Sequence, residues 1–335
     1  MIPSRVLVLT TGGTIASVAD GAGRLVATKT GPEVIAELEA ARGQGSGVEC
    51  VVEEFCCLPS PELSVADMWN LAMRIRERTA RSGLSGVVVT HGTDVMEESA
   101  FLTHLTHASE IPVVFTGAQR VRAEPGFDGI RNLNAAIELA AALAARPCGV
   151  MIAMDGLAVA AFGAQKVHTN ASRPFRGIMQ AEIDDVLAGR ARHFSGRSAG
   201  GSVDPTTCTL PLPRVSLVKL VAGMRPEVLS AVVQAEGAAG LVIEGFGMGS
   251  ANRGQLSEIS RLVEDGTMVV MTTRCAEGSV LPRYAQGGGA DVQEAGALLI
   301  AGLPATQLRL ATAIALASCR NVGLAEQRLR DLVWP

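Results

Sequence analysis

A short apolar run ends in hydroxyl side chains and a glycine pair in the stretch Arg5-Val6-Leu7-Val8-Leu9-Thr10-Thr11-Gly12-Gly13-Thr14-Ile15-Ala16. The run does not alternate polar and apolar residues, so it predicts a strand that is buried on both faces. A second run, Gly86–Thr90, leads into His91-Gly92-Thr93-Asp94. Ligands of open α/β sheets bind at the carboxyl ends of strands, so two such polar turns can face one crevice.

Strands and helices alternate through the first half of the chain. The pattern predicts further strands at Pro112–Phe115 and Gly149–Ala153, and helices at Pro61–Arg78, Val95–Thr106 and Ile130–Ala145. Asp128 is a candidate N-cap for the last of these helices. The alternation predicts an α/β fold in which helices cover both faces of a large parallel sheet.

The chain changes character after residue 190, where Ser, Gly, Arg and Pro replace the periodic apolar pattern. We therefore expect an N-terminal α/β domain at residues 1–190, a linker at 191–213 and a smaller C-terminal α/β domain at 214–335. The smaller domain is predicted to contain strands at Ser216–Val221, Gly240–Glu244 and Thr267–Thr272, and helices near Pro226–Gln234, Gln255–Glu264 and Ala305–Cys319.

The composition excludes several classes of protein. Hydrophobic residues make up 48% and charged residues 19% of the 335 residues, which excludes a disordered chain. A net charge of -4 and few aromatic residues predict no nucleic-acid partner. The apolar stretches end before the ~20 residues of a bilayer span, so no membrane association is expected. Seven cysteines without C-x-x-C spacing fit reduced thiols, and a cytoplasmic location is expected.

Each polar turn taken alone is typical of ordinary structure. A glycine pair after a strand usually forms a turn, and Asp94 followed by Glu97 resembles a capping box at a helix start. Taken together, Thr11-Gly12-Gly13-Thr14-Ile15-Ala16 and His91-Gly92-Thr93-Asp94-Val95-Met96-Glu97-Glu98-Ser99-Ala100 closely resemble the paired signatures of the bacterial-type L-asparaginase/glutaminase family.

The resemblance continues in the family's order along the chain. It includes Gly117-Ala118-Gln119-Arg120, Asp128-Gly129, Asn132-Leu133, Lys166-Val167-His168-Thr169 and Phe175. It is close from Arg5 to Gly177 and looser in the second half, at Gly245–Gly249 and Arg274–Gly278. It implies two α/β domains, a homodimer or homotetramer, and hydrolysis of the side-chain amide of L-asparagine to aspartate and ammonia, with no metal and no organic cofactor.

The resemblance also implies roles for individual residues. Thr14 is the implied nucleophile, with Thr93, Asp94 and Lys166 as a second catalytic cluster. The implied substrate-binding residues are Ser60, Pro61, Gly92, Thr93, Asp94 and Ala118, with Ser60 on the α-carboxylate and the backbone N–H groups of Gly92 and Thr93 at the oxyanion.

The chemistry of amide hydrolysis supports these roles, because an unactivated carboxamide needs a nucleophile, a proton shuttle and oxyanion donors. A lysine in a dry, polar pocket loses affinity for its proton and can take one from a hydroxyl or water. Structural alternatives stay open: Lys166 as a surface lysine, Thr93 as a helix-start hydroxyl and Thr14 as a turn residue. Whether Thr14 forms an acyl-enzyme or orients water also stays open.

Three departures from the family pattern affect the expected site. Pro61 stands where a glutamine is frequent, and its ring offers no donor; Glu62 either compensates or is a helix-start acid. The segment Ser17–Thr30, expected to be a mobile lid, has no tyrosine. Tyr284, the only tyrosine, either contributes to a neighbouring subunit's site in trans or only packs. Some family members receive an acidic residue from a neighbouring subunit, and Glu277 and Glu294 are the candidates for it here.

The sequence is also compatible with functions other than the amidohydrolase. Pro61 and the missing lid tyrosine also fit a binding or regulatory protein with weak catalysis, and the substrate can instead be glutamine or D-asparagine. A third hypothesis is an amidase subunit that feeds ammonia to a tRNA-charging partner. Such a partner would need a docking region, for which the few residues before the first strand leave little room.

His104 and His107 lie three apart, but no third metal ligand is evident. Gly245–Gly249 has the wrong spacing for a dinucleotide fingerprint.

Overall fold

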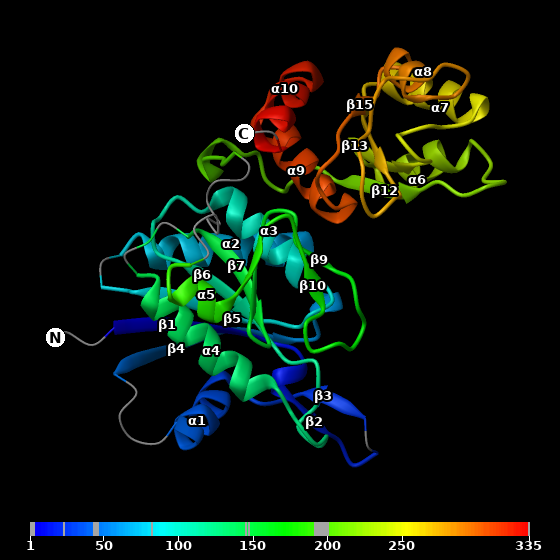
Figure 1. Cartoon of the computed structure of the whole chain (residues 1–335). Helices are drawn as coiled ribbons and strands as arrows, with labels where there is room; N and C mark the ends of the chain where they lie inside the picture. Colours follow the sequence, from blue (N-terminus) through cyan, green and yellow to red (C-terminus); the bar gives the residue numbers. More distant parts are fainter. Residues whose placement is uncertain are drawn as a thin grey trace. The chain divides into compact units, whose positions relative to one another are not determined.

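The computed structural model describes residues 4–22, 24–42, 47–81, 83–144, 146, 148–190 and 201–333. Its contacts divide the chain after Ser202 into two compact units, which are described separately (Figure 1). The expected linker at 191–213 spans this division. Residues 191–200 of it lie outside the described residues, and the chain from Val203 onward belongs to the second unit, where Pro205–Thr207 forms a 3-10 helix.

The N-terminal unit is built on a seven-stranded, mostly parallel sheet, so the predicted α/β fold is confirmed. Its order is β11 (Gln180–Glu182), β8 (Leu157–Ala160), β7 (Val150–Met154), β6 (Val113–Thr116), β5 (Gly86–Thr90), β1 (Ser4–Gly12) and β4 (Val48–Leu58). The five strands from β7 to β4 are parallel. At one edge β8 pairs antiparallel with β7, and β11 pairs antiparallel with β8. Thr10, Thr90 and Thr116 lie in register, which aligns the carboxyl ends of β1, β5 and β6.

Helices cover both faces of this sheet, as the unbroken apolar runs predict. Val6, Val8 and Val88 point to the face packed by α1 (Gly31–Arg42), α4 (Gly129–Ala142) and α5 (Ile183–Leu187). Leu7, Leu9 and Val87 point to the other face, packed by α2 (Val65–Thr79) and α3 (Met96–Thr106). Successive side chains of a strand alternate between faces, so one apolar run supplies both cores.

Small elements surround the carboxyl ends of the strands. A 3-10 helix, η1 (Thr14–Ala16), follows β1, and another, η2 (Ser60–Glu62), follows β4. The expected lid segment forms an antiparallel hairpin of β2 (Ser17–Ala19) and β3 (Leu25–Ala27). A second antiparallel pair joins β9 (Gln165–Lys166) to β10 (Phe175–Arg176). These elements carry several of the residues implied in the site.

Three local expectations differ from the structure. The helix predicted from Pro61 begins at Val65, because Ser64 and Asp67 form a capping box there and Pro61 lies in η2. Asp128 does occupy the N-cap position of α4, but its carboxylate does not cap the helix. Neither α1 nor β4 was predicted; β4 is a half-buried edge strand with interspersed glutamates, so it lacks the apolar run of its neighbours.

The C-terminal unit repeats the architecture on a smaller scale. Its parallel sheet has the order β12 (Val215–Lys219), β13 (Gly240–Gly245), β14 (Met268–Thr273) and β15 (Leu298–Leu299). The helices are α6 (Val228–Glu236), α7 (Arg253–Glu264), α8 (Gly289–Glu294), α9 (Ala305–Ser318) and α10 (Val322–Val333). The three predicted strands and three predicted helices are present with shifted ends, whereas α8, β15 and α10 were not predicted.

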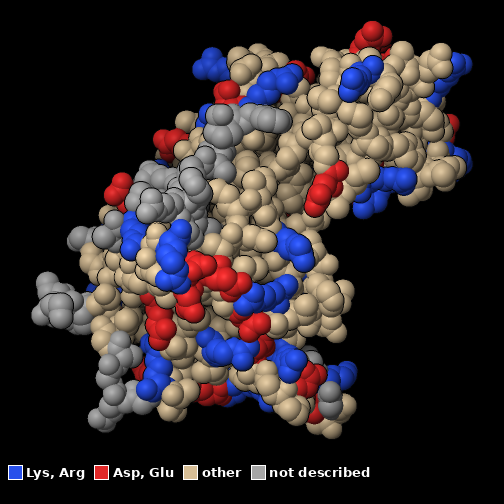
Figure 2. Space-filling model, in the orientation of Figure 1, with Lys and Arg blue, Asp and Glu red and all other residues tan. Residues whose placement is uncertain are grey.

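The surface and the cysteines add little that is unusual. In the view of Figure 2, positive and negative side chains are interspersed over the N-terminal unit. None of the helices in the described part of the chain is long and apolar enough to cross a bilayer. All seven cysteines are free, and burial raises the pKa of the Cys56 thiol to about 11, which keeps it protonated and unreactive.

The capping box of α2 gives a test of the fold. Ser64→Ala removes the side-chain acceptor for the N–H of Asp67, so we expect the N-terminal unit to lose about 1 kcal/mol of unfolding free energy in urea titrations. Asn70→Ala, on the exposed side of the same helix, is the control and should change stability by less than about 0.5 kcal/mol. Equal effects of the two substitutions would contradict the capping role.

Candidate active site

The two polar turns found in the sequence are in direct contact. Thr11 Oγ1 donates to the carbonyl of Thr90 at 3.0 Å, across the β1–β5 pair. Beyond the strands, a Cβ on Gly13 would lie 2.6 Å from the backbone of Gly92, and Gly13 has a φ of 77°. Only a glycine permits this approach and this conformation without strain. The turns after β1 and β5 therefore meet.

The turn after β4 joins the same place. The N–H of Gly13 donates to the carbonyl of Leu58 at 3.1 Å, and a Cβ on Gly92 would lie 2.7 Å from Ser60 Oγ. Ser60 is buried, and its Oγ accepts the N–H of Asp94 at 3.3 Å. Three loops from three adjacent parallel strands thus converge, which brings Ser60 beside the Gly92–Asp94 turn.

Lys166 joins this turn from β9, more than seventy residues further along the chain. Its Nζ donates to Thr93 Oγ1 at 2.8 Å and to Asp94 Oδ1 at 2.6 Å. The Lys166 side chain is 15% exposed and Thr93 is buried, whereas the Asp94 side chain is 61% exposed. The ammonium is therefore not a solvated surface group, and Asp94 keeps one face toward solvent.

Thr14 lies at the first position of η1, directly after Gly13, and is half-buried. The Gly13–Gly92 contact places it one residue from the turn that carries Thr93. Pro61, in contrast, is exposed in η2 together with Glu62. The structure therefore gathers Ser60, Gly92, Thr93, Asp94 and Lys166 through direct contacts, and Thr14 by its position in the chain.

Ala118 lies on the turn after β6 and is buried. Asp128 fixes this turn, because its carboxylate accepts the N–H groups of Gln119 and Arg120 at 3.0 to 3.2 Å. Asn132 completes this support, because its Nδ2 donates to the Gly117 carbonyl at 3.0 Å and to Asp128 at 3.1 Å. The sequence matched both residues to the family pattern without giving either one this role.

Glu97 is a site residue that the sequence analysis missed. It was interpreted as the acid of a capping box, but the N-cap of α3 is Val95 and has no side-chain hydrogen bond. The buried Glu97 carboxylate instead accepts the backbone N–H of Lys166. Both acids of the expected capping box contact Lys166, Asp94 through the lysine Nζ and Glu97 through the lysine backbone N–H. An acid just beyond a site turn was the available signal, but its partner is distant in sequence.

His91 is fully buried between the turn and β6. Burial lowers its pKa to about 4, so the ring is neutral at neutral pH. Because a carbonyl only accepts, the 2.7 Å contact of Nδ1 with the Gly92 carbonyl assigns the ring hydrogen to Nδ1. His91 therefore shapes the turn, in line with the sequence interpretation, and carries no charge into the site.

Other candidate features lie apart from this cluster. The His104 ring packs near Phe101 and Phe162, and His107 Nε2 lies 2.9 Å from the Ile111 carbonyl. The described ranges contain no group of three or more His, Cys, Asp or Glu side chains that is placed to hold a metal ion. Tyr284 is 57% exposed in the C-terminal unit, so its contribution in trans stays a prediction.

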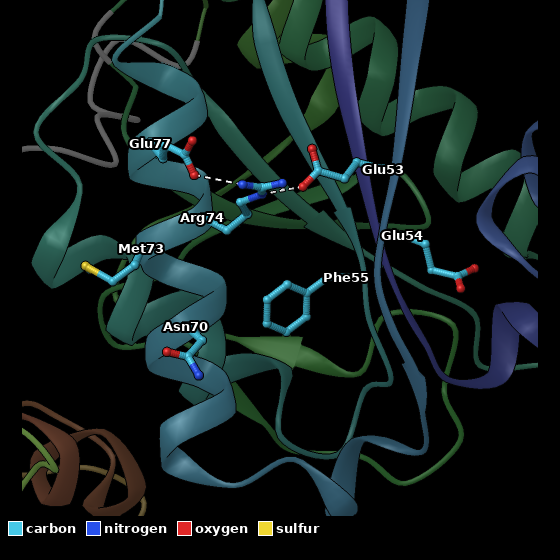
Figure 3. A pocket seen from close by; sticks show the side chains of 7 residues that line it. All are labelled: Glu53, Glu54, Phe55, Asn70, Met73, Arg74 and Glu77. Carbon is cyan, nitrogen blue, oxygen red and sulfur yellow. Dashed lines mark hydrogen bonds and ion pairs between the residues drawn. The ribbon is translucent and has the colours of Figure 1, made fainter.

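An open depression of about 460 Å³ lies between β4 and α2 (Figure 3). Its lining contains none of the site residues above; it consists of Glu53, Glu54, Phe55, Asn70, Met73, Arg74 and Glu77. Arg74 bridges Glu53 and Glu77, and Arg78 also pairs with Glu53. The two pairs with Glu53 join β4 to α2, and the Arg74–Glu77 pair lies within α2. The depression is therefore separate from the Thr93–Lys166 cluster, which is the candidate active site.

Comparison with known proteins agrees with this geometry. Residues 5–198 match the family described as "Asparaginase, N-terminal", and residues 214–326 match "Glutaminase/Asparaginase C-terminal domain". A "Probable L-asparaginase" of Deinococcus radiodurans is 34% identical over 97% of this chain and 96% of its own length. One component of the glutamyl-tRNA(Gln) amidotransferase of Halobacterium salinarum is 32% identical over 87% of this chain and 71% of its own length.

The fold is shared with a solved structure as well. The crystal structure of a "Probable Cytoplasmic L-asparaginase" from Campylobacter jejuni superposes with a TM-score of 0.77 at 24% identity, and covers 98% of this chain and 99% of that one. The two family matches together span most of the chain. The chain therefore belongs to the asparaginase family of amidohydrolases.

Proposed function

We propose that the protein hydrolyses the side-chain amide of L-asparagine to aspartate and ammonia. The observation that carries the proposal is the position of Lys166 Nζ, which contacts both Thr93 Oγ1 and Asp94 Oδ1 beside the junction of three strand-end turns. A proton donor, a hydroxyl and a carboxylate thus lie together at the edge of the sheet where ligands of α/β folds bind.

Two side chains are suited to hold the substrate's amino-acid end. Ser60 Oγ accepts the Asp94 N–H, so its own hydrogen can be donated to a substrate α-carboxylate. Asp94 uses Oδ1 for Lys166, and its exposed side chain can offer Oδ2 to a substrate ammonium. Pro61 adds no donor here, so recognition rests on Ser60 and Asp94, with Ala118 and Gly92 as apolar and backbone walls.

The proposed chemistry uses the Thr14 hydroxyl as nucleophile. Its oxygen attacks the amide carbon, and the N–H groups of Gly92 and Thr93 bind the oxyanion. Thr93 Oγ1 accepts a hydrogen bond from Lys166 Nζ, so the Thr93 hydroxyl can give its own proton to the amide nitrogen and take the Thr14 proton in its place. The C–N bond breaks and ammonia leaves, while Lys166 remains an ammonium that polarises Thr93. Water then attacks the Thr14 ester, which releases aspartate and restores the hydroxyl. Glu97 positions Lys166 in this scheme through the Lys166 backbone N–H.

We also propose an assembly of two or four copies of the chain, in the cytoplasm, with the Tyr284 segment of one copy near the site of another. The second candidate function is a component that acts with a partner protein, which the similarity to part of a glutamyl-tRNA(Gln) amidotransferase favours. An activity assay separates the two candidate functions, because an asparaginase needs only the free amino acid and water.

The purified protein should release ammonia from L-asparagine without any partner or added cofactor. A coupled ammonia assay with L-asparagine, L-glutamine and D-asparagine at equal concentrations checks this. The highest kcat/KM is expected for L-asparagine. Thermal stabilisation by asparagine without ammonia release would contradict the proposal and favour the binding-protein hypothesis, and turnover of only glutamine or D-asparagine would reassign the substrate.

Thr93→Val replaces the hydroxyl that Lys166 contacts with a methyl group of similar size. We expect kcat to fall by about 100-fold to 10,000-fold, the usual range for a lost proton-transfer group. The fold should persist, as circular dichroism and the melting temperature can check. Thr93→Ser is the matched control because it keeps the hydroxyl. Near-normal turnover of the valine variant would overturn the assigned role.

The buried His91 predicts an acid-sensitive stability. The unfolded chain binds a proton at His91 below about pH 6.5, but the folded chain does so only near its lowered pKa of about 4. Stability is therefore complete above about pH 6.5 and is lost as the pH falls toward 4, by about 3 kcal/mol from this group. Urea unfolding at pH 7 and pH 4.5 should show a smaller loss for His91→Asn than for the wild type. Equal losses would refute the buried, neutral state.

A further inference from the structure

Three charged side chains from three separate segments meet beside the Thr14 turn. Glu37 of α1 pairs with Lys29, just after the hairpin, and with Arg122, in the loop between β6 and α4. We call Lys29, Glu37 and Arg122 the Arg122 cluster. Their side chains are 27%, 33% and 17% exposed, respectively, so the ion pairs are partly shielded from solvent and are held more strongly than exposed pairs.

Arg122 connects this cluster directly to η1. Its Nη1 pairs with Glu37, while Nη2 donates to the carbonyl of Ile15 at 2.8 Å. The guanidinium also lies over the Phe127 ring, 4.9 Å from its centroid, which limits its freedom. The residue before Ile15 is Thr14, the proposed nucleophile. Arg122 therefore holds the peptide group between Ile15 and Ala16, one residue beyond Thr14, and so helps to fix the position of Thr14.

The base of the hairpin is attached to the same short helix. The carbonyl of Ala16 accepts the N–H of Thr28 at 3.1 Å and the N–H of Lys29 at 3.0 Å. Lys29 thus binds η1 through its backbone and Glu37 through its side chain. The Ile15 side chain is buried in the core with α1 and α4. The position of η1 is fixed from the core side by packing and from the hairpin side by the charged cluster.

The charge on Glu37 maintains this arrangement. Burial raises the pKa of the Glu37 carboxyl, but the hydrogen bonds and charges of Lys29 and Arg122 outweigh it, so the pKa lies below its ordinary value. The carboxylate stays ionised at neutral pH and can bridge the two cations. Neutralising either Glu37 or Arg122 would leave a partly buried charge with fewer partners.

The geometry points to Arg122 as a positioning residue for Thr14 and, through Glu37, as the link that couples the hairpin base to the nucleophile turn. The inference rests on the proposed function for its catalytic part. The hydrogen bonds and ion pair of Arg122 described above do not involve Thr93, Asp94 or Lys166. Its loss should therefore change the placement of the nucleophile and leave the contacts of Ser60 and Asp94 intact.

The test measures amide hydrogen exchange and kinetics together on the full chain. Arg122→Met keeps the length of the side chain but removes its donors, so exchange at the N–H groups of Ala16, Thr28 and Lys29 should quicken about 10-fold or more. The kcat for asparagine should fall by a similar factor, with KM changed by less than about 3-fold. Glu37→Gln, which is nearly isosteric, should also quicken exchange and lower kcat, but by less than Arg122→Met does.

Two comparisons make the outcome decisive. Arg131→Met breaks the exposed Arg131–Asp155 pair in the same unit and should leave both exchange and kcat unchanged. Arg122→Lys keeps the charge but lacks the planar fork that reaches two acceptors, so it should recover part of kcat. Recovery of kcat would not follow if Arg122 only supported the fold.

Each contrary result has a distinct meaning. Wild-type exchange rates at Ala16, Thr28 and Lys29 in the Arg122→Met protein would overturn the inference, whatever the activity. Faster exchange with unchanged kcat would overturn it too, because Thr14 would then not depend on the cluster. A wild-type protein that releases no ammonia would defeat the proposed function instead, and the exchange rates would still test the link between Arg122 and η1.

Discussion

The close approach of two glycine backbones is the constraint on which the site depends. Gly13 and Gly92 lie so near to each other that a Cβ on Gly13 would collide with the Gly92 backbone. The parallel pairing of β1 with β5 supplies the alignment, and the missing Cβ supplies the room. Without this contact, Thr14 and Thr93 would stand on separate loops at the carboxyl ends of β1 and β5.

Buried carboxylates do much of the remaining positioning. Glu97 holds the backbone of Lys166, and Asp128 holds the turn that carries Ala118. In both cases the acceptor is a carboxylate oxygen and the donor is a backbone N–H, which gives a strong and directional bond. Both acids thus bind the backbone of the site loops and hold those loops in place. Asp94 is the acid that remains exposed enough to touch a substrate.

The departures from the family pattern concern substrate recognition more than chemistry. Thr93, Asp94 and Lys166 are joined by hydrogen bonds from the Lys166 ammonium, so this part of the proposed proton-transfer group lies within one chain. Pro61 is exposed and offers no donor, and the segment Ser17–Thr30, which contains the hairpin, has no tyrosine. The departures therefore leave the contacts of Lys166 in place and remove a side-chain donor at position 61.

The sequence by itself determined the alternation of strands and helices, the strand-end location of the polar turns and the identity of the family. Those features follow from local apolar patterns and short motifs, which need no knowledge of distant contacts. The edge strand β4 was not predicted, because it is half-buried and mixes glutamates with apolar residues, so its pattern matches no simple period. Only the tertiary structure decided that Glu97 serves Lys166 and not its own helix, and that Asp128 serves a turn. A carboxylate binds a donor that lies close to it in space. The donor to Glu97 is 69 residues away in sequence, and the backbone donors to Asp128 lie eight and nine residues away, outside its own helix.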